Sequence, residues 1–140
     1  MELHEPKNLY ELLTLNMEQR FANRVAFRWY DADRDVVVEK HFGEYAQDIR
    51  RAVNYYLSTI PDIQGKRVCV WSNNSYHYAV NCYGVMMAGG VVVPLNQRKS
   101  WEELHYELEL VEPTLILTDG EDHGCNEEIQ AAYGSLLRPM

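Results

Sequence analysis

The feature that most constrains the fold is an alternation, between residues 68 and 118, of short apolar runs with longer helical patterns. The three runs are residues 68–71, 91–93 and 114–118, and none of them shows a clear polar face. Strands that are apolar on both faces are typical of parallel sheets, because helices cover both faces of such sheets. We therefore expect an α/β fold with half of a doubly wound parallel sheet, in the order β-α-β-α-β, and residues 91–93 as a central strand.

Both helical patterns between these runs carry start and stop signals. Residues 73–75 (Asn-Asn-Ser) offer N-cap side chains for a helix over about residues 76–88, which Gly89 and Gly90 end. Residues 100–103 (Ser-Trp-Glu-Glu) match a capping box for the second helix, and Pro113 blocks its continuation. Each helix thus connects two strands, as a crossover between parallel strands requires.

The sequence before residue 68 predicts a helix, an antiparallel hairpin and a second helix. Apolar residues at helical spacing favour the first helix over residues 8–21, with Asn8 as its N-cap. Residues 25–30 and 36–42 are rich in β-branched and aromatic side chains, and the Asp-rich stretch between them predicts a hairpin loop. The most amphipathic helix covers residues 44–60, with Leu57 on its apolar face. A last helix is expected at residues 125–137.

The length and the charge of the chain narrow its possible classes. With 140 residues it has the size of one domain, or of part of a larger one, and can bury a core without disulfides. Its formal net charge of -8 disfavours a nucleic-acid partner, because phosphates would be repelled. Residues 100–140 hold ten acids and one base. We interpret this region as a solvated acidic face, and a surface for a basic partner is the alternative.

The cysteines and the apolar stretches indicate a cytoplasmic protein without a transmembrane segment. Cys69, Cys82 and Cys125 form no CxxC pair, and an odd number of widely spaced cysteines is typical of reduced thiols. The first residues carry acids where a signal peptide needs bases. The longest apolar stretch, residues 84–95, is too short and too rich in glycine to cross a bilayer.

The sequence contains no recognisable phosphate-binding loop or metal site. Gly84, Gly89 and Gly90 lie at the end of a predicted helix, whereas a dinucleotide fingerprint or a P-loop lies between a strand and a helix. The histidines and cysteines lack the paired spacing of zinc ligands. We therefore expect no metal ligand in this chain.

Asn96 and Arg98 are the candidate substrate-binding residues. They follow the second predicted parallel strand, and open α/β sheets bind ligands at the carboxyl ends of their strands. Asn96 offers an amide and Arg98 a positive charge. The alternative interpretation is a solvated loop.

Residues 86–96 (Met-Met-Ala-Gly-Gly-Val-Val-Val-Pro-Leu-Asn) closely resemble the AGa-V-vPlN segment of the adenylate-forming (AMP-binding) superfamily. That superfamily includes acyl-CoA synthetases, firefly luciferases and the adenylation domains of peptide synthetases. Weaker similarities flank this segment at residues 8–27, 41–45, 68–75 and 102–117, and the similarity at residues 41–45 is imperfect. The resemblance covers about residues 8–119, in the order and spacing of the family.

The resemblance implies that residues 1–140 are a single unit, the N-terminal subdomain of a larger ligase domain of the acyl-CoA synthetase or long-chain-fatty-acid–CoA ligase type. The family's phosphate loop, its magnesium-binding acid and its C-terminal lysine come after the region matched here. No catalytic, cofactor-binding or metal-binding residue therefore transfers to this chain. For the parent enzyme the resemblance implies ATP, Mg, CoA and a carboxylic acid. The carboxylate attacks the α-phosphorus of ATP to give an acyl-adenylate and pyrophosphate, and a thiol then takes the acyl group and displaces AMP.

Two other interpretations stay open from the sequence. The chain could belong to a peptide-synthetase-type adenylation domain, where a carrier-protein thiol replaces CoA, or be a complete small α/β binding or interaction module. As a fragment, it is expected to lack adenylation activity. We also expect it to self-associate, because half of a doubly wound sheet leaves an apolar edge or face uncovered.

Overall fold

The computed structural model describes residues 5–140. Its contacts divide the chain into two compact units, one up to Ala52 and one from Val53 to Met140, and each is described by itself. That the whole chain forms one N-terminal subdomain of a larger ligase domain stays a prediction.

The first unit begins with a capped helix. The Asn8 side chain accepts a hydrogen bond from the Glu11 backbone N–H at 2.8 Å, so Asn8 is the N-cap that the sequence indicates. The short α1 (Leu9–Glu11) continues directly into η1 (Leu12–Arg20), which has the wider turn of a π-helix. The predicted helix is therefore present, but most of it has a geometry that its apolar spacing did not indicate.

An antiparallel hairpin follows, as predicted. Its strands are β1 (Val25–Asp31) and β2 (Val36–His41). The next helix, α2 (Phe42–Thr59), packs Tyr45 edge-on against Phe27 of the hairpin, with 4.9 Å between the ring centroids. This aromatic pair attaches the start of α2 to β1 within the first unit.

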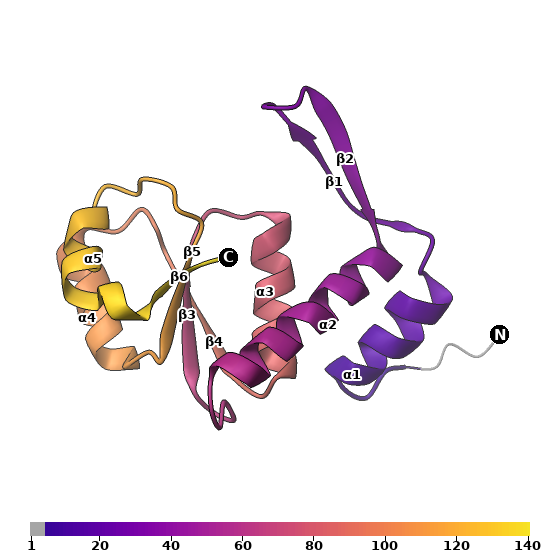
Figure 1. Cartoon of the computed structure of the whole chain (residues 1–140), viewed down its shortest axis with the longest axis horizontal. Coiled ribbons are helices and arrows are strands. Elements are labelled where there is room, and N and C mark those ends of the chain that lie inside the picture. Colours follow the sequence, from indigo (N-terminus) through magenta and orange to yellow (C-terminus); the bar gives the residue numbers. More distant parts are fainter. Residues whose placement is uncertain (1–4) are drawn as a thin grey trace. The chain divides into compact units, whose positions relative to one another are not determined.

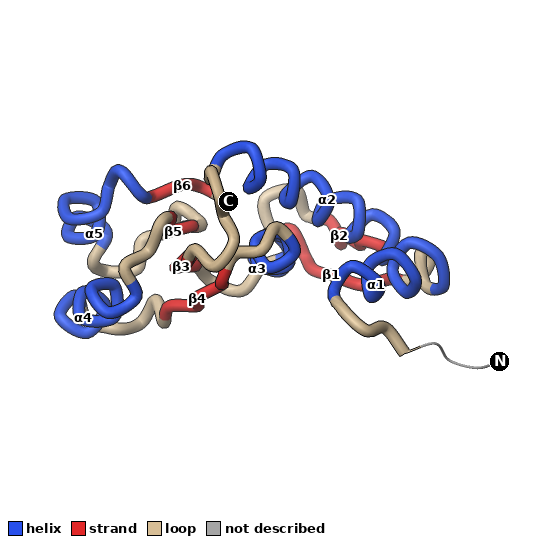
Figure 2. Tube along the Cα trace, turned by 90° about the horizontal axis from the view of Figure 1, so that it is seen from below, coloured by secondary structure: helices blue, strands red, loops and turns tan. Residues whose placement is uncertain are grey.

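The second unit contains a four-stranded sheet in the order β4-β3-β5-β6, and each neighbouring pair is parallel. Figure 2 shows the strands side by side in this order. They are β3 (Arg67–Trp71), β4 (Val91–Leu95), β5 (Leu115–Thr118) and β6 (Leu137–Pro139). The predicted fold class, a parallel half-sheet preceded by a helix and an antiparallel hairpin, is confirmed.

The position of β4 differs from the prediction. Residues 91–93 were expected in a central strand, but β4 lies at the edge of the described sheet, and β3 and β5 are the inner strands. Val91 is 46% exposed, and Pro94 lacks the N–H that a central strand would need for pairing on both sides. A run of three valines is compatible with either position, so the apolar pattern alone could not decide. Self-association through such an edge stays a prediction.

Helices cover both faces of the sheet. Figure 1 shows α3 (Tyr76–Met87) on one side, and α4 (Trp101–Val111) and α5 (Asn126–Tyr133) on the other. The core between the sheet and the α4–α5 side is a cluster of buried side chains. Its members are Cys69, Trp71, Leu95, Leu104, Leu108, Ile116, Cys125 and Ile129. The predicted capping box at the start of α4 is present, because the side chains of Ser100 and Glu103 each bond to the other's backbone N–H.

Two glycines end α3 with a tight reversal. The Gly90 N–H donates to the Val85 carbonyl at 2.9 Å, and the Gly89 N–H donates to the Met86 carbonyl at 3.1 Å. These two bonds are the pattern of a Schellman motif, which needs a residue with positive φ after the helix. Gly89 has a φ of +100° and fulfils that need.

The end of the chain differs from the expected single helix over residues 125–137. The helix α5 stops at Tyr133, a short 3₁₀ turn η2 (Gly134–Leu136) follows, and β6 then pairs with β5. Three residues of the sequence Leu-Arg-Pro carry no strand pattern. They are extended because the edge of β5 offers them backbone partners. Within residues 5–140, no helix is both long and apolar enough to cross a membrane.

Candidate functional site: the carboxyl edge of the parallel sheet

The connections of the sheet diverge at the carboxyl end of β3. The chain leaves β3 toward α3 on one face, whereas it leaves β4 and β5 toward α4 and α5 on the other face (Figure 1). Loops that diverge from neighbouring parallel strands leave room between them, and this is where open α/β sheets bind ligands. The loops after β3, β4 and β5 are therefore the candidate functional site.

Three polar side chains connect these loops. The Asp119 carboxylate, directly after β5, accepts a hydrogen bond through Oδ2 from the Asn73 backbone N–H at 2.7 Å. The Asn73 side chain accepts through Oδ1 a hydrogen bond from Gln97 Nε2 at 2.8 Å. A continuous set of hydrogen bonds thus runs from the end of β5, through the loop after β3, to the loop after β4.

Asp119 is held by two further partners. Its Oδ1 accepts from the Glu121 backbone N–H at 3.0 Å and lies 2.9 Å from His123 Nε2. The His123 ring in turn packs edge-on against Trp71, with 4.8 Å between the centroids. The side chains of Asp119 and His123 are only 15% and 5% exposed. Burial by itself raises the pKa of Asp119, but the bonds from Asn73, Glu121 and His123 outweigh it and lower the pKa below its ordinary value.

The structure places both sequence-predicted residues in the loop after β4. The Asn96 side chain accepts the Arg98 backbone N–H at 2.9 Å, so its oxygen closes a local turn. Arg98 is exposed, and no side chain or backbone group within residues 5–140 forms a hydrogen bond or an ion pair with its guanidinium. Arg98 is therefore the member of the pair whose functional group is free for a ligand. That either residue binds substrate stays a prediction.

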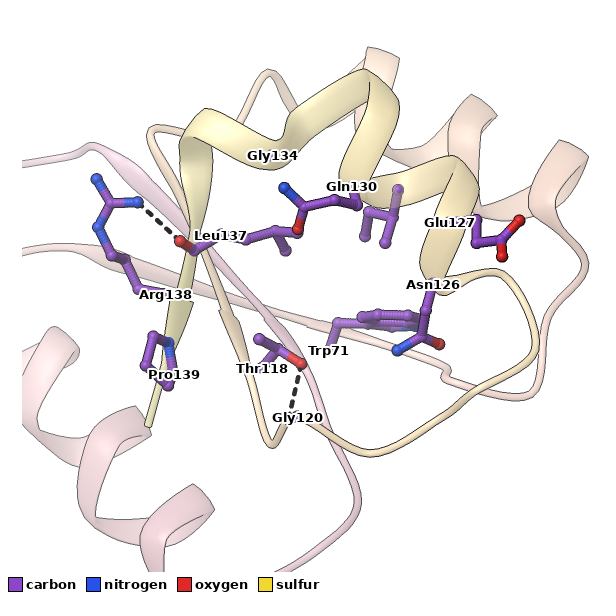
Figure 3. Close-up of a pocket in the computed structure, with 11 residues that line it drawn as sticks. Trp71, Thr118, Gly120, Asn126, Glu127, Gln130, Gly134, Leu137, Arg138 and Pro139 are labelled. Carbon is purple, nitrogen blue, oxygen red and sulfur yellow. Dashed lines mark hydrogen bonds between the residues drawn. The ribbon is translucent and has the colours of Figure 1, made fainter.

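An open pocket of about 660 Å³ lies beside this network, between α5 and β6. Figure 3 shows Trp71, Thr118 and Gly120 from the carboxyl edge on one side of it and Arg138 on the other. Arg138 donates through Nη1 to the carbonyls of Ser135 and Leu137. This nitrogen is therefore directed at the chain's own backbone.

Burial determines the protonation state of two thiols, Cys69 in β3 and Cys82 in α3. Burial raises the pKa of Cys69 to about 12 and also raises the pKa of Cys82, so both thiols stay protonated and serve as packing groups. Within residues 5–140, no group of three or more His, Cys, Asp or Glu side chains could hold a metal ion.

Sequence reasoning did not identify the hydrogen-bonded network. It treated Asn73 as part of a helix cap and His123 only as one of the histidines that lack the spacing of zinc ligands. The position of Asn73 and Asp119 just after two parallel strands was a usable signal, because the carboxyl ends of such strands meet at one edge. No sequence signal indicated the contact of His123 with Trp71.

Residues 19–136 match the family model of the AMP-binding enzymes. The chain belongs to this family. The match includes all three loops of the carboxyl edge and most of both units. It confirms the resemblance that residues 86–96 indicate.

Three known proteins illustrate what the chain is similar to in sequence or in structure. A curated CoA ligase of Rhodococcus jostii (strain RHA1), named for a substituted octahydroindenyl-propanoyl group, is 38% identical over 56 residues, which are 40% of this chain and 11% of that protein. A fatty acyl CoA synthetase of Mycobacterium tuberculosis superposes with a TM-score of 0.77 at 18% identity, over 95% of this chain and 26% of that one. ATP-bound MatB of Rhodopseudomonas palustris gives a TM-score of 0.68 at 21% identity, over 94% and 25%. The chain thus spans about a quarter of the structures that share its fold.

The lowered pKa of Asp119 predicts how stability depends on pH. A carboxylate whose pKa is lower in the folded state stabilises that state above its unfolded pKa of about 4, and this contribution disappears as the pH falls through the folded pKa. The free energy of unfolding of the wild type should therefore fall more between pH 5 and pH 3 than that of Asp119→Asn. Urea unfolding at both values measures this. Glu121→Gln removes a neighbouring charge and should keep the wild-type dependence, and an equal slope in Asp119→Asn would contradict the prediction.

Proposed function

We propose that the chain is the N-terminal, non-catalytic part of an ATP-dependent acid–thiol ligase of the acyl-CoA synthetase type. The observation that carries this proposal is the family match over residues 19–136. The CoA ligase of Rhodococcus jostii and the fatty acyl CoA synthetase of Mycobacterium tuberculosis support the same reaction class. The parent enzyme would convert a carboxylic acid and ATP into an acyl-adenylate and pyrophosphate, and then transfer the acyl group to the thiol of CoA with release of AMP, in the cytoplasm.

The described residues do not by themselves fit magnesium or the phosphates of ATP. Within residues 5–140 no acidic cluster could hold a metal, and the loop after β5 carries Asp119, Glu121 and Asp122, which would repel phosphate. No step of the reaction is therefore assigned to this chain. Its contribution is a rigid sheet whose carboxyl edge presents the Asn96 amide and the Arg98 guanidinium to an anionic group of the substrate.

A peptide-synthetase-type adenylation domain is the alternative within the same family. Both kinds of enzyme form an acyl-adenylate, so they differ only in the acid and in the thiol that accepts it. The third interpretation, a complete small binding module, would need no ATP at all.

Assays of the longer polypeptide that contains this chain test the proposal. It should catalyse ATP–pyrophosphate exchange with at least one acid from a panel of fatty, aryl and amino acids, and the 140-residue chain alone should not. Transfer of the activated acid to free CoA, rather than to a carrier protein, supports the acyl-CoA synthetase. Transfer only to a carrier protein supports the alternative. If no longer polypeptide exists, or if the chain alone catalyses exchange, the proposal is wrong.

A further inference from the structure

We propose that Asp119 is a positioning residue: through Asn73 and Gln97 it fixes the loop that carries Arg98 at the carboxyl edge of the sheet. The role of Arg98 rests on the proposed function. The hydrogen-bonded connection itself does not, and it can be tested in the chain alone.

Asp119 is a suitable anchor because a buried strand and three polar partners hold it in place. It follows β5, whose residues Leu115–Leu117 are buried. Its two oxygens accept bonds from the Asn73 and Glu121 backbone N–H groups and contact His123 Nε2, at 2.7–3.0 Å. Hydrogen bonds to an ionised group are stronger than neutral ones, so this carboxylate is held more firmly than an exposed side chain.

Asn73 connects Asp119 to the loop after β4 through two hydrogen bonds. Its backbone N–H is bound by Asp119, while its side chain, which is exposed, binds Gln97. Asn73 lies between β3 and α3 in a stretch of three consecutive exposed residues, 73–75. Two bonds hold the Asn73 backbone: its N–H donates to Asp119, and its carbonyl accepts from the Ser72 hydroxyl at 2.7 Å.

The loop after β4 is rigid internally but needs an attachment. The bond from the Arg98 N–H to the Asn96 side chain closes its turn, Leu95 is buried before it, and Lys99 pairs with Glu107 of α4 after it. Between these points the Gln97 side chain is the connection to the loop after β3. The Gln97–Asn73 bond therefore helps to place the backbone from which the Arg98 side chain projects.

A fixed loop has a direct consequence for binding. An arginine whose backbone is already held in place loses less conformational entropy when an anion binds than one on a flexible loop. Loss of the anchor should therefore weaken ground-state binding more than the chemical step, which appears as a higher KM with little change in kcat.

Hydrogen exchange followed by NMR in the 140-residue chain tests the connection. Asp119→Ala and Asn73→Ala should each speed exchange of the Gln97 side-chain amide and the Arg98 backbone amide roughly fivefold, the effect of losing one hydrogen bond. Glu121→Gln, the matched control, removes a nearby charge but no bond of the network and should change neither amide. The Val70 amide of β3 reports global stability and should not change in Asn73→Ala.

The outcomes distinguish a failure of the proposed hydrogen-bonded connection from a failure of the proposed ligase function. If Asn73→Ala leaves the Gln97 amide unchanged, the proposal is overturned, even if Asp119→Ala fails to fold. In the longer enzyme, Asp119→Ala should raise KM roughly fivefold without a comparable fall in kcat, and should add little to the KM of Arg98→Ala. If the Asp119→Ala variant of the longer enzyme is active and its KM equals that of the wild type, the positioning role is overturned. A longer polypeptide without activity overturns the proposed function and leaves the exchange result standing.

Discussion

Replacing Leu108 by alanine should reduce the free energy of unfolding by about 2–5 kcal/mol, the range measured for buried leucines. Leu108 has no exposed surface and belongs to the cluster between the sheet and the α4–α5 side. Its loss leaves a cavity in a cluster to which Cys69, Trp71 and Ile116 also belong, and these three lie in strands that cannot easily move into the space. A domain of this size is stable by only about 5–15 kcal/mol, so the change removes a large share.

Leu110 on the same helix provides the matched control. It is 66% exposed, so Leu110→Ala makes the same chemical change without opening a core cavity. Urea unfolding should give a loss of less than about 0.5 kcal/mol for this variant. Similar losses for the two variants would show that α4 does not pack on the sheet through Leu108.

Replacing Gly90 by alanine should destabilise the second unit by about 1–3 kcal/mol, the usual cost of overpacking a core. A Cβ at this position would lie 2.8 Å from Val85 Cγ1 and 3.3 Å from Ile63 Cγ1, both on buried residues. Alanine also restricts the unfolded chain, which favours folding by about 0.4–1 kcal/mol. The clash is the larger effect, because the Val85 methyl group sits on a short, branched side chain that cannot swing away.

A second substitution distinguishes the clash from a change in backbone preference. Val85→Ala removes the clashing methyl group, so the double variant should lose less stability than the sum of the two single ones, with a coupling of about 0.5–3 kcal/mol. Gly65→Ala is the control, because Gly65 has a φ of +76° but no atom within 4 Å of an added Cβ. Its cost comes from the backbone alone, and Val85→Ala should not reduce it. Strictly additive losses for Gly90→Ala and Val85→Ala would rule out the clash.

Part of the candidate site was predictable from the sequence. Asn96 and Arg98 could be placed after a parallel strand because a single apolar run, residues 91–93, precedes them. The hydrogen-bonded network that connects this loop to the loops after β3 and β5 could not be predicted. Asn73, Gln97 and Asp119 are 22 or more positions apart, and no local pattern links them. Their contact depends on the order of the strands, which places β3 between β4 and β5.

The sequence by itself determined the elements whose cause is local. Asn8, Ser75 and Ser100 cap the helices that they were expected to cap, because a side-chain oxygen three residues before a backbone N–H meets it in any such turn. The parallel arrangement was also determined, since apolar runs such as residues 115–117 need cover on both faces.

Only the tertiary structure decided which strand lies where. A run of valines fits the centre or the edge of a sheet, and β4 is at the edge because β3 is its only partner among the described strands. Leu57 shows the same limit: the helical pattern placed it on the apolar face of α2, but it is 54% exposed. Residues 137–139 become a strand only because β5 offers an unpaired edge. In each case the local pattern permits several environments, and the partner, which lies far away in the sequence, selects one of them.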